Sequence, residues 1–459
     1  MPTDRPSEEL SNYLASFGRA RLPAHVVEMA KNLLIDHFGV SIAARDLQWT
    51  RLVRDQALAE RGAPQSTIYG SIKVTARNAA LVNGTMAHGI ELDDTHIAST
   101  SHMGAVVVPA ALAMAEWKRA SGRVFLNAVV AGCEAIGRIG GRAGRALVEA
   151  GFHPTPVYGV FGATAAAGVI LGLDTQQMNH AFGIALSSAS GVMQFSLENE
   201  GTMVKRLHAG MAAERGILAA SLASAGFTGP LQAIEGQYGV LAAFARVDRD
   251  RHALDGLGER FAIEDVSYKA YACCLHFGAL ADCLVQAKRD EGDLHDRVQR
   301  VEVFGPRALF DNHMERRPSS VMAAQYSMPF TTAVALMLDP RNPEAFSEGV
   351  MNRADVLALS DKVVGSATAD LEKLFPAKFP ACTRIHLDDG RVVERTVVDA
   401  PGTAARPFAR AELIEKFDVL TNDRLSNGRK GLLLHAIQTI DDSDVVEPLV
   451  GLLRACGED

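Results

Sequence analysis

Apolar residues recur at helical spacing through the first half of the chain, from about residue 8 to residue 245. The clearest segments are GAVVVPAALAMAEW, VFLNAVVAGCEAIGRI and AAERGILAASLASAGF, all rich in alanine or glycine. This spacing predicts helices, and the small side chains let helix axes approach closely. Asp174, with Gln177 three residues later, predicts a capped helix start. We therefore predict an all-α domain over residues 1–260.

The pattern changes after about residue 261, where apolar and polar residues alternate in QRVEVFG and RIHLDDGRVVERTVV. Asp389-Gly390 separates two such runs and predicts a hairpin. Because the helical stretches FGALADCLVQAKRD and MPFTTAVALML lie among these strands, we predict a smaller α+β domain over residues 261–402. After the linker-like PGTAARP, helical spacing returns, and we expect residues 403–459 to pack back on the first domain. The predicted fold class is mainly α.

Charge and composition narrow the classes of partner. The 46 Lys and Arg residues against 54 Asp and Glu residues give a net charge of −8, so nucleic acid is not an expected partner. A carboxylate ligand would need a local cluster of cations. The uncharged run 151–173 contains His153, Pro154 and Pro156 and is rich in alanine and glycine, which favours a buried helix over a membrane span.

Cysteine usage and the N-terminus complete this picture. The six cysteines are too sparse for a disulfide framework, and C-x-x-C does not occur, so we expect reduced thiols, no metal and no cofactor. The first residues, MPTDRPSEELSNYLASFG, have no apolar core of the kind that a secretory signal needs. These features predict a cytoplasmic protein.

The densest polar group of the first half is HGIELDDTHIASTSH, which includes Glu91, Asp93, Asp94, Thr95 and His102. Its apolar flanks predict a helix end and a loop held between core helices. Such residues can form an acid/base or substrate site. The alternatives are a network of helix caps and solvated charges, or a metal site, whose geometry this spacing does not define.

Two further motifs contain a candidate base and candidate cations for binding a carboxylate. In GFHPTPVYG, His153 stands in an uncharged setting, where a neutral imidazole can act as a base, or can simply be a core residue. ENEGTMVKRLHAG contains Lys205, Arg206 and His208. On a helix, Lys205 and His208 share a face and could clamp a carboxylate while Arg206 points elsewhere; solvent-exposed charges are the alternative.

The later segments SYKAYACCLHFGALAD and AAQYSMPF contribute Lys269, His276 and Tyr326 near the expected domain boundary, where sites commonly lie. A non-enzymatic helical scaffold would instead carry these polar groups as caps and surface networks. It predicts that His102, His153 and Lys205 lie far apart and face solvent.

Taken in order, HGIELDDTH, H-x-G-A, GFHPT, GTMVKRLHAG, K-x-Y-x-C-C, YSMPF and KFPACTRIHLDDG resemble the successive signatures of the MmgE/PrpD family. The resemblance runs from about residue 31 to about residue 420. It implies a helical domain with a smaller α+β lid domain, an active site between them, no cofactor and a homodimer. Members include 2-methylcitrate dehydratases, cis-aconitate decarboxylases and iminodisuccinate epimerases, which share proton transfer beside a carboxylate.

The resemblance also implies roles for individual residues. General acid/base roles fall to His102 and His153, and carboxylate binding with charge stabilisation falls to Lys205. Asp93 or Asp94 would orient a histidine or the lysine. The expected substrate-binding residues are Glu91, where relatives often have Asp, with Thr95, Arg206, His208, Lys269, His276 and Tyr326.

The leading hypothesis is a lyase of the 2-methylcitrate dehydratase type that eliminates water from a small polycarboxylate. An epimerase and a decarboxylase are the alternatives, since all three need the same base and the same carboxylate clamp. The chain departs from the family pattern at Gly278, where relatives tend to have histidine, and at Phe330, where they often have tyrosine. Both changes fall in the expected lid, so they concern the identity of the substrate more than the proton chemistry.

Overall fold

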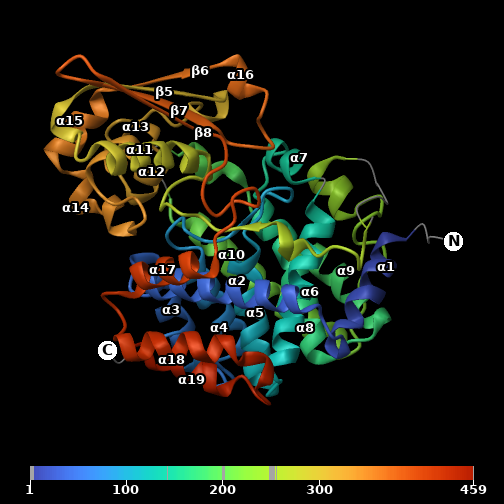
Figure 1. Ribbon diagram of the computed structural model, residues 1–459. Helices are drawn as coiled ribbons and strands as arrows, with labels where there is room; N and C mark the ends of the chain where they lie inside the picture. The colour runs from blue at the N-terminus through green and yellow to red at the C-terminus, as the bar shows by residue number, and fades with distance from the viewer. Residues whose placement is uncertain (1–4, 142, 199–201, 248–253, 255, 458–459) are drawn as a thin grey trace.

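The computed structural model describes residues 5–141, 143–198, 202–247, 254 and 256–457, so residues 199–201 of the Lys205 motif lie outside it. The described chain is mostly helical with a small four-stranded sheet, as the sequence predicts, and two further pairs of two-residue strands (Figure 1). The helices of the first half are α1 (Pro6–Ala15), α2 (Ala24–Ala43), α3 (Gln48–Ala59), α4 (Ala76–Ala87), α5 (Met103–Lys118), α6 (Gly122–Gly140), α7 (Gly144–Glu149), α8 (Pro154–Leu171), α9 (Thr175–Ser188) and α10 (Val204–Ser224).

Helix α8 forms the centre of this bundle and packs against α5, α6, α9 and α10. It is the helix of the described chain that is long and apolar enough to cross a membrane, yet 89% of its apolar window is buried inside the protein. The expectation of a buried helix in this run is therefore confirmed. The predicted cap at Asp174 is also present, with Gln177 completing the capping box of α9.

Glycines bring α4 and α10 into close contact. A methyl group added at Gly84 would lie 2.7 Å from the Cα atom of Gly210, so the two backbones touch at this point. Gly84 lies one turn before the end of α4, and Gly210 lies near the start of α10. The crossing therefore holds the loop that follows α4 against the first turns of α10.

The second part of the chain contains a four-stranded sheet of order β6-β5-β7-β8. Its strands are β5 (Val298–Gly305), β6 (Val363–Ala367), β7 (Ala381–Leu387) and β8 (Val392–Val397). Strand β6 runs parallel to β5, while β5–β7 and β7–β8 are antiparallel. The predicted hairpin at Asp389-Gly390 joins β7 to β8, and Gly390 adopts the left-handed conformation (φ +84°) that its turn requires.

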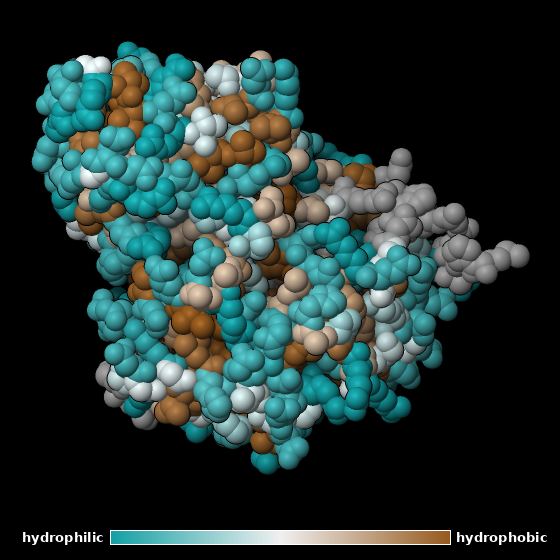
Figure 2. Space-filling view, viewed as in Figure 1, coloured by the Kyte–Doolittle hydropathy of each residue, from teal (hydrophilic) through white to brown (hydrophobic). Residues whose placement is uncertain are grey.

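Short helices lie beside this sheet, and Figure 1 shows them gathered with it at one end of the molecule. They are α11 (Gly278–Glu291), α12 (Val321–Gln325), α13 (Met328–Met337), α14 (Glu348–Met351), α15 (Ala354–Asp361) and α16 (Ala369–Glu372). Helix α11 packs on β7, β8 and α13. On the face viewed in Figure 2, hydrophilic residues predominate and apolar patches are separate.

The chain then returns to the helical bundle through α17 (Arg410–Thr421), α18 (Asn427–Gln438) and α19 (Glu447–Ala455). Helices α17 and α18 pack on α2. A two-residue strand, β3 (Thr95–His96), pairs with β4 (Val266–Ser267) and ties the loop after α4 to the later segment. The limits 1–260, 261–402 and 403–459 remain a prediction.

Candidate active site

A cavity of about 280 Å³ lies where side chains of the helical bundle meet side chains of the later segment. Eight of the predicted site residues line it: Glu91, Thr95, His102, His153, Lys205, Lys269, His276 and Tyr326. The scaffold hypothesis expected His102, His153 and Lys205 to lie apart and in solvent. Because all three border one cavity, the arrangement is that of a site.

Glu91 is the centre of a buried ion cluster at the cavity wall. Its Oε1 accepts hydrogen bonds from Lys205 Nζ and Arg206 Nη1, and its Oε2 lies 3.2 Å from Lys269 Nζ. The hydroxyl of Tyr326 lies 2.9 Å from Lys205 Nζ and 3.4 Å from Glu91 Oε2. Glu91 also has a left-handed backbone (φ +57°), which is costly for a residue with a side chain and which these contacts hold in place.

This geometry shifts the pKa values of the charged groups in the cluster. Burial would raise the pKa of Glu91, but Lys205, Lys269 and Arg206 together hold it well below its ordinary value. Burial lowers the pKa of Lys205, whereas for Lys269 the nearby Glu91 outweighs burial and raises the pKa. Lys269 Nζ also lies 4.0 Å from Asp93 Oδ1, so three basic side chains face two carboxylates and still leave an excess of positive charge. The site therefore contains the local cation cluster that an anionic ligand needs.

Asp93 orients two histidines. Its Oδ2 accepts from His88 Nδ1 at 2.6 Å and lies 3.0 Å from His102 Nδ1, which also contacts the main-chain oxygen of Asp94 at 2.7 Å. Because a carboxylate and a carbonyl can only accept, both rings carry their proton on Nδ1. The Nε2 lone pairs of His88 and His102 are then left for other partners, and His88 Nε2 has none among the described residues.

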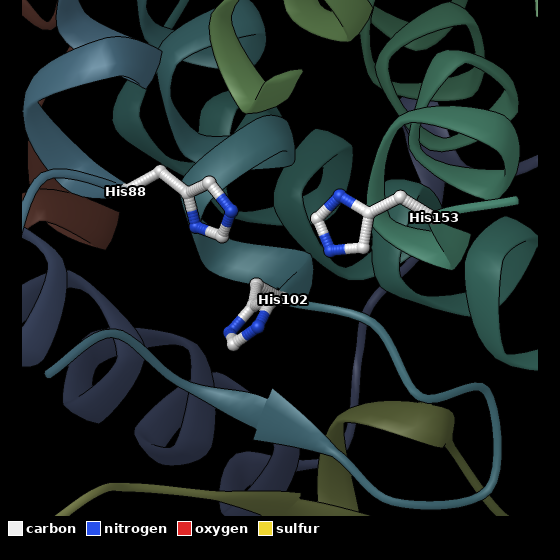
Figure 3. A group of neighbouring side chains, drawn as sticks. All are labelled: His88, His102 and His153. Carbon is white, nitrogen blue, oxygen red and sulfur yellow. The ribbon is translucent and has the colours of Figure 1, made fainter. Parts of the chain in front are cut away.

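His153 and His208 form the second histidine pair, with 2.9 Å between their Nδ1 atoms. One ring must donate and the other accept, so at least one is neutral. Burial lowers the pKa of His208 to about 4 and lowers that of His153 well below its ordinary value. In Figure 3 the rings of His88, His102 and His153 face one another from three different segments. A neutral His153 beside the cavity is suited to accept a proton.

Asp94 and Thr95 differ in their surroundings. Asp94 accepts from the main-chain N–H of Gly104 at 2.9 Å at the start of α5, and burial raises the pKa of its carboxyl to about 8. It does not line the cavity, so it supports the helix start rather than a ligand. Thr95 lines the cavity, and its buried hydroxyl has no hydrogen-bond partner among the described residues.

The expectation that Arg206 points elsewhere is wrong. Its guanidinium is buried, contacts Glu91, and donates to Gln325 Oε1 at 2.9 Å. The reason is that Glu91 in the loop after α4 and Gln325 in α12 both bind the guanidinium, which draws it into the buried cluster although Met203 and Val204 at the same end of α10 are exposed. Arg206 and His208 do not line the cavity; they lie behind Glu91 and His153.

The two departures from the family pattern have separate explanations. Phe330 is fully buried in α13 and lies outside the cavity, so Tyr326 provides the phenol there. Gly278 begins α11, where an added methyl group would lie 3.1 Å from Ala400 Cβ, and it is not part of the cavity wall. His276 takes the place at the wall, with its Nδ1 bonded to the main-chain oxygen of Ala308 at 3.2 Å.

Sequence reasoning missed three residues of this region. His88 was visible in the polar motif but was not selected, although it shares Asp93 with His102. His313 borders the cavity, and Gln325 bridges Arg206 to the main chain of the loop after α4. His313 stands in the charged run DNHMERR and Gln325 stands in AAQYSMPF, but neither run shows by itself which of its polar residues face the site.

Two groups of described residues have ligand atoms close enough together to bind a metal ion. His88, His102 and His153 each offer a ligand atom within 4.8 Å of the others, and so do Cys274, His276 and His313. In the first group two rings are held by Asp93 as metal-bound histidines often are, and the same arrangement also suits two acid/base groups.

Two models of one protein family match this chain. The model of the MmgE/PrpD N-terminal domain matches residues 8–251, and that of the MmgE/PrpD C-terminal domain matches residues 271–441. A cis-aconitate decarboxylase of Aspergillus terreus is 27% identical over 472 residues, covering 97% of this chain and 95% of its own.

Two other relatives show the same breadth of similarity. The cis-aconitate decarboxylase-like protein oryM of Aspergillus oryzae is 26% identical over 482 residues, covering 98% of each chain. A human cis-aconitate decarboxylase is 26% identical over 446 residues, covering 94% of this chain and 91% of its own. Together with the two domain matches, these similarities show that the chain belongs to the MmgE/PrpD family.

Proposed function

We propose that this protein is a cofactor-independent lyase that moves a proton at a carbon next to a carboxylate of a small polycarboxylic acid. The observation that carries the proposal is the pairing, in one cavity, of neutral His153 with the cationic amines of Lys205 and Lys269. The amines would bind a carboxylate and stabilise the charge that develops on its oxygens. His153 and His102 would exchange the proton with the adjacent carbon.

The proposed reaction is decarboxylation of cis-aconitate or a close analogue. Relatives named cis-aconitate decarboxylase match nearly the whole chain, which favours this over the elimination of water that the motifs first suggested. In decarboxylation a C–C bond breaks, CO₂ leaves, and the electron pair left behind must be protonated. His102 or His153 would take up a proton from water and deliver it to that carbon, while the cations hold the remaining carboxylates.

Dehydration of a 2-methylcitrate-like acid and epimerisation use the same proton transfer. They differ in the leaving group: hydroxide leaves in the first, and nothing leaves in the second. The cavity wall contributed by the later segment, including His276 and Tyr326, would decide which substrate fits.

The test is to incubate the purified protein separately with cis-aconitate, 2-methylcitrate, citrate and iminodisuccinate, and to follow products by NMR and CO₂ release. Release of CO₂ from cis-aconitate with formation of a dicarboxylate supports the proposal. Alkene formation from a hydroxy acid without CO₂ would replace it with the dehydratase, and inversion alone would replace it with the epimerase. Inactivity toward all four compounds would contradict the proposed substrate class.

A further inference from the structure

A lysine of the C-terminal helices reaches the main chain of the loop after α4, residues 88–94. Lys416, in α17, donates from Nζ to the main-chain oxygen of Leu92 at 2.7 Å and to Asp36 Oδ1, in α2, at 2.5 Å. The side chains of Lys416 and Asp36 are 9% and 1% exposed, so both contacts lie inside the protein. Lys416 is not among the described residues that line the cavity, so it acts on the site only through this loop.

The backbone of this loop is held by side chains from other parts of the chain. Residues 88–94, all of which the structure describes, lie outside any helix or strand. Three alternate carbonyl oxygens accept hydrogen bonds from side chains: Ile90 O from Gln325 Nε2 at 2.9 Å, Leu92 O from Lys416 Nζ, and Asp94 O from His102 Nδ1 at 2.7 Å. A buried carbonyl without a donor is costly, so each bond fixes the local path of the chain.

Leu92 lies between the two carboxylates that organise the site. Its carbonyl belongs to the peptide group that leads into Asp93, whose side chain orients His88 and His102. On the other side, Glu91 has a left-handed backbone (φ +57°), a conformation that persists only where the surrounding structure holds it. Loss of the bond to Leu92 O would therefore let Asp93 move, together with the two rings that it orients.

The ion pair with Asp36 holds Lys416 in this buried place. Burial raises the pKa of the Asp36 carboxyl, and the adjacent Lys416 lowers it. Hydrogen bonds from a charged donor are stronger than those between neutral groups, which suits Lys416 to hold a carbonyl. Removing Lys416 alone would leave a buried carboxylate without its cation, so a test must remove both charges together.

From these contacts we infer that Lys416 is a positioning residue for the reaction: it holds the main-chain oxygen of Leu92, keeps Asp93 in place and thereby sets the orientation of His102. The inference adds a residue remote from the cavity to the proposed function, and its kinetic test rests on that function. A displacement of about 1 Å in a catalytic group can slow a reaction about 100-fold. Loss of a group that orients such a residue costs about 10- to 100-fold.

The experiment removes the donor without leaving an unpaired charge. The double variant Asp36→Asn/Lys416→Met has neutral side chains of similar length at both positions. Its kcat toward whichever of the four acids is turned over should fall about 10- to 100-fold. The matched control is Lys430→Met in α18, because the side chain of Lys430 is 6% exposed and bonds to Asn422 Oδ1 at 3.3 Å rather than to the loop after α4. The control should keep its kcat, and circular dichroism checks that both proteins are folded.

A spectroscopic measurement separates positioning from a general loss of stability and needs no turnover. The Nδ1 atoms of His88 and His102 lie 2.6 Å and 3.0 Å from Asp93 Oδ2. With histidine isotope-labelled at its ring nitrogens, the protons on these atoms should give downfield NMR signals in the wild type. We expect the signals to shift or disappear in the double variant and to stay unchanged in Lys430→Met.

The two readouts together decide the role of Lys416. A lower kcat with altered imidazole signals, in the double variant alone, supports the inference. Unchanged kcat or unchanged signals in the folded double variant would overturn it, and so would the same changes in Lys430→Met. If none of the four acids reacts, the proposed function fails and the imidazole signals alone decide: altered signals support the positioning role, and unchanged signals overturn it.

Discussion

Replacing Glu91 by glutamine tests the ion cluster directly. The change keeps the shape of the side chain but removes the single negative charge that Lys205, Arg206 and Lys269 share. Glu91 is 1% exposed, so water does not replace the lost carboxylate. Removing one partner of a buried ion pair typically costs about 3–5 kcal/mol, and we expect the free energy of unfolding of Glu91→Gln to fall by that amount.

The assay is urea unfolding followed by tryptophan fluorescence. The two tryptophans of the chain, Trp49 and Trp117, both lie in the helical half, and Trp49 packs against Arg206 at 5.6 Å. The fluorescence signal therefore reports the part of the protein that holds Glu91.

The matched control is Glu415→Gln. Glu415 forms an ion pair of similar length with Arg341, 2.9 Å, but the two side chains are 63% and 47% exposed. Exposed pairs contribute about 0–1 kcal/mol, so this variant should unfold close to the wild type. Equal unfolding curves for Glu91→Gln and the wild type would refute the view that Glu91 neutralises buried cations.

Three further variants test other parts of the account. His153→Asn should lower kcat about 100- to 10,000-fold with the fold retained, while His435→Asn, on an exposed part of α18, should not; equal rates would remove His153 from proton transfer. Asp94 has an ordinary pKa of 3.8 that the fold raises to about 8, so its contribution to stability is full below pH 3.8 and is lost as the pH rises through about 8. The free energy of unfolding, measured from pH 3.8 to about 8, should decline less in Asp94→Asn than in the wild type. An equal decline in the two proteins would contradict the burial of a neutral carboxyl. Gly84→Ala should cost about 1–3 kcal/mol through overpacking against α10, whereas Gly431→Ala, with no atom within 4 Å, should not lower the melting temperature.

Local sequence patterns predicted most of the fold. Helical periodicity, the cap at Asp174 and the Asp389-Gly390 turn each depend on residues close together in the chain, and each is present in the structure. The parallel pairing of β6 with β5 was not predicted. It joins strands far apart in sequence, and no local pattern specifies such a pairing.

The site was predictable where a dense motif met a core helix, as at Glu91, His102, His153 and Lys205. The position of Arg206 was predicted wrongly because its partners, Glu91 and Gln325, come from segments far away in the sequence, which a helix wheel does not include. His88 was not predicted because the motif contains several histidines, and spacing alone does not show which of them bonds to Asp93. Such distinctions depend on tertiary contacts.

The central claim is that the cavity transfers a proton between His102 or His153 and a carbon beside a carboxylate. The most direct measurement is NMR of the substrate and product after reaction in deuterated water, for the wild type and for Lys205→Met. The account predicts one deuterium at a carbon next to a carboxylate, placed on one face, in the wild type and a strongly reduced rate in the variant. Turnover with no solvent deuterium in the product, or equal rates in the two proteins, would contradict it.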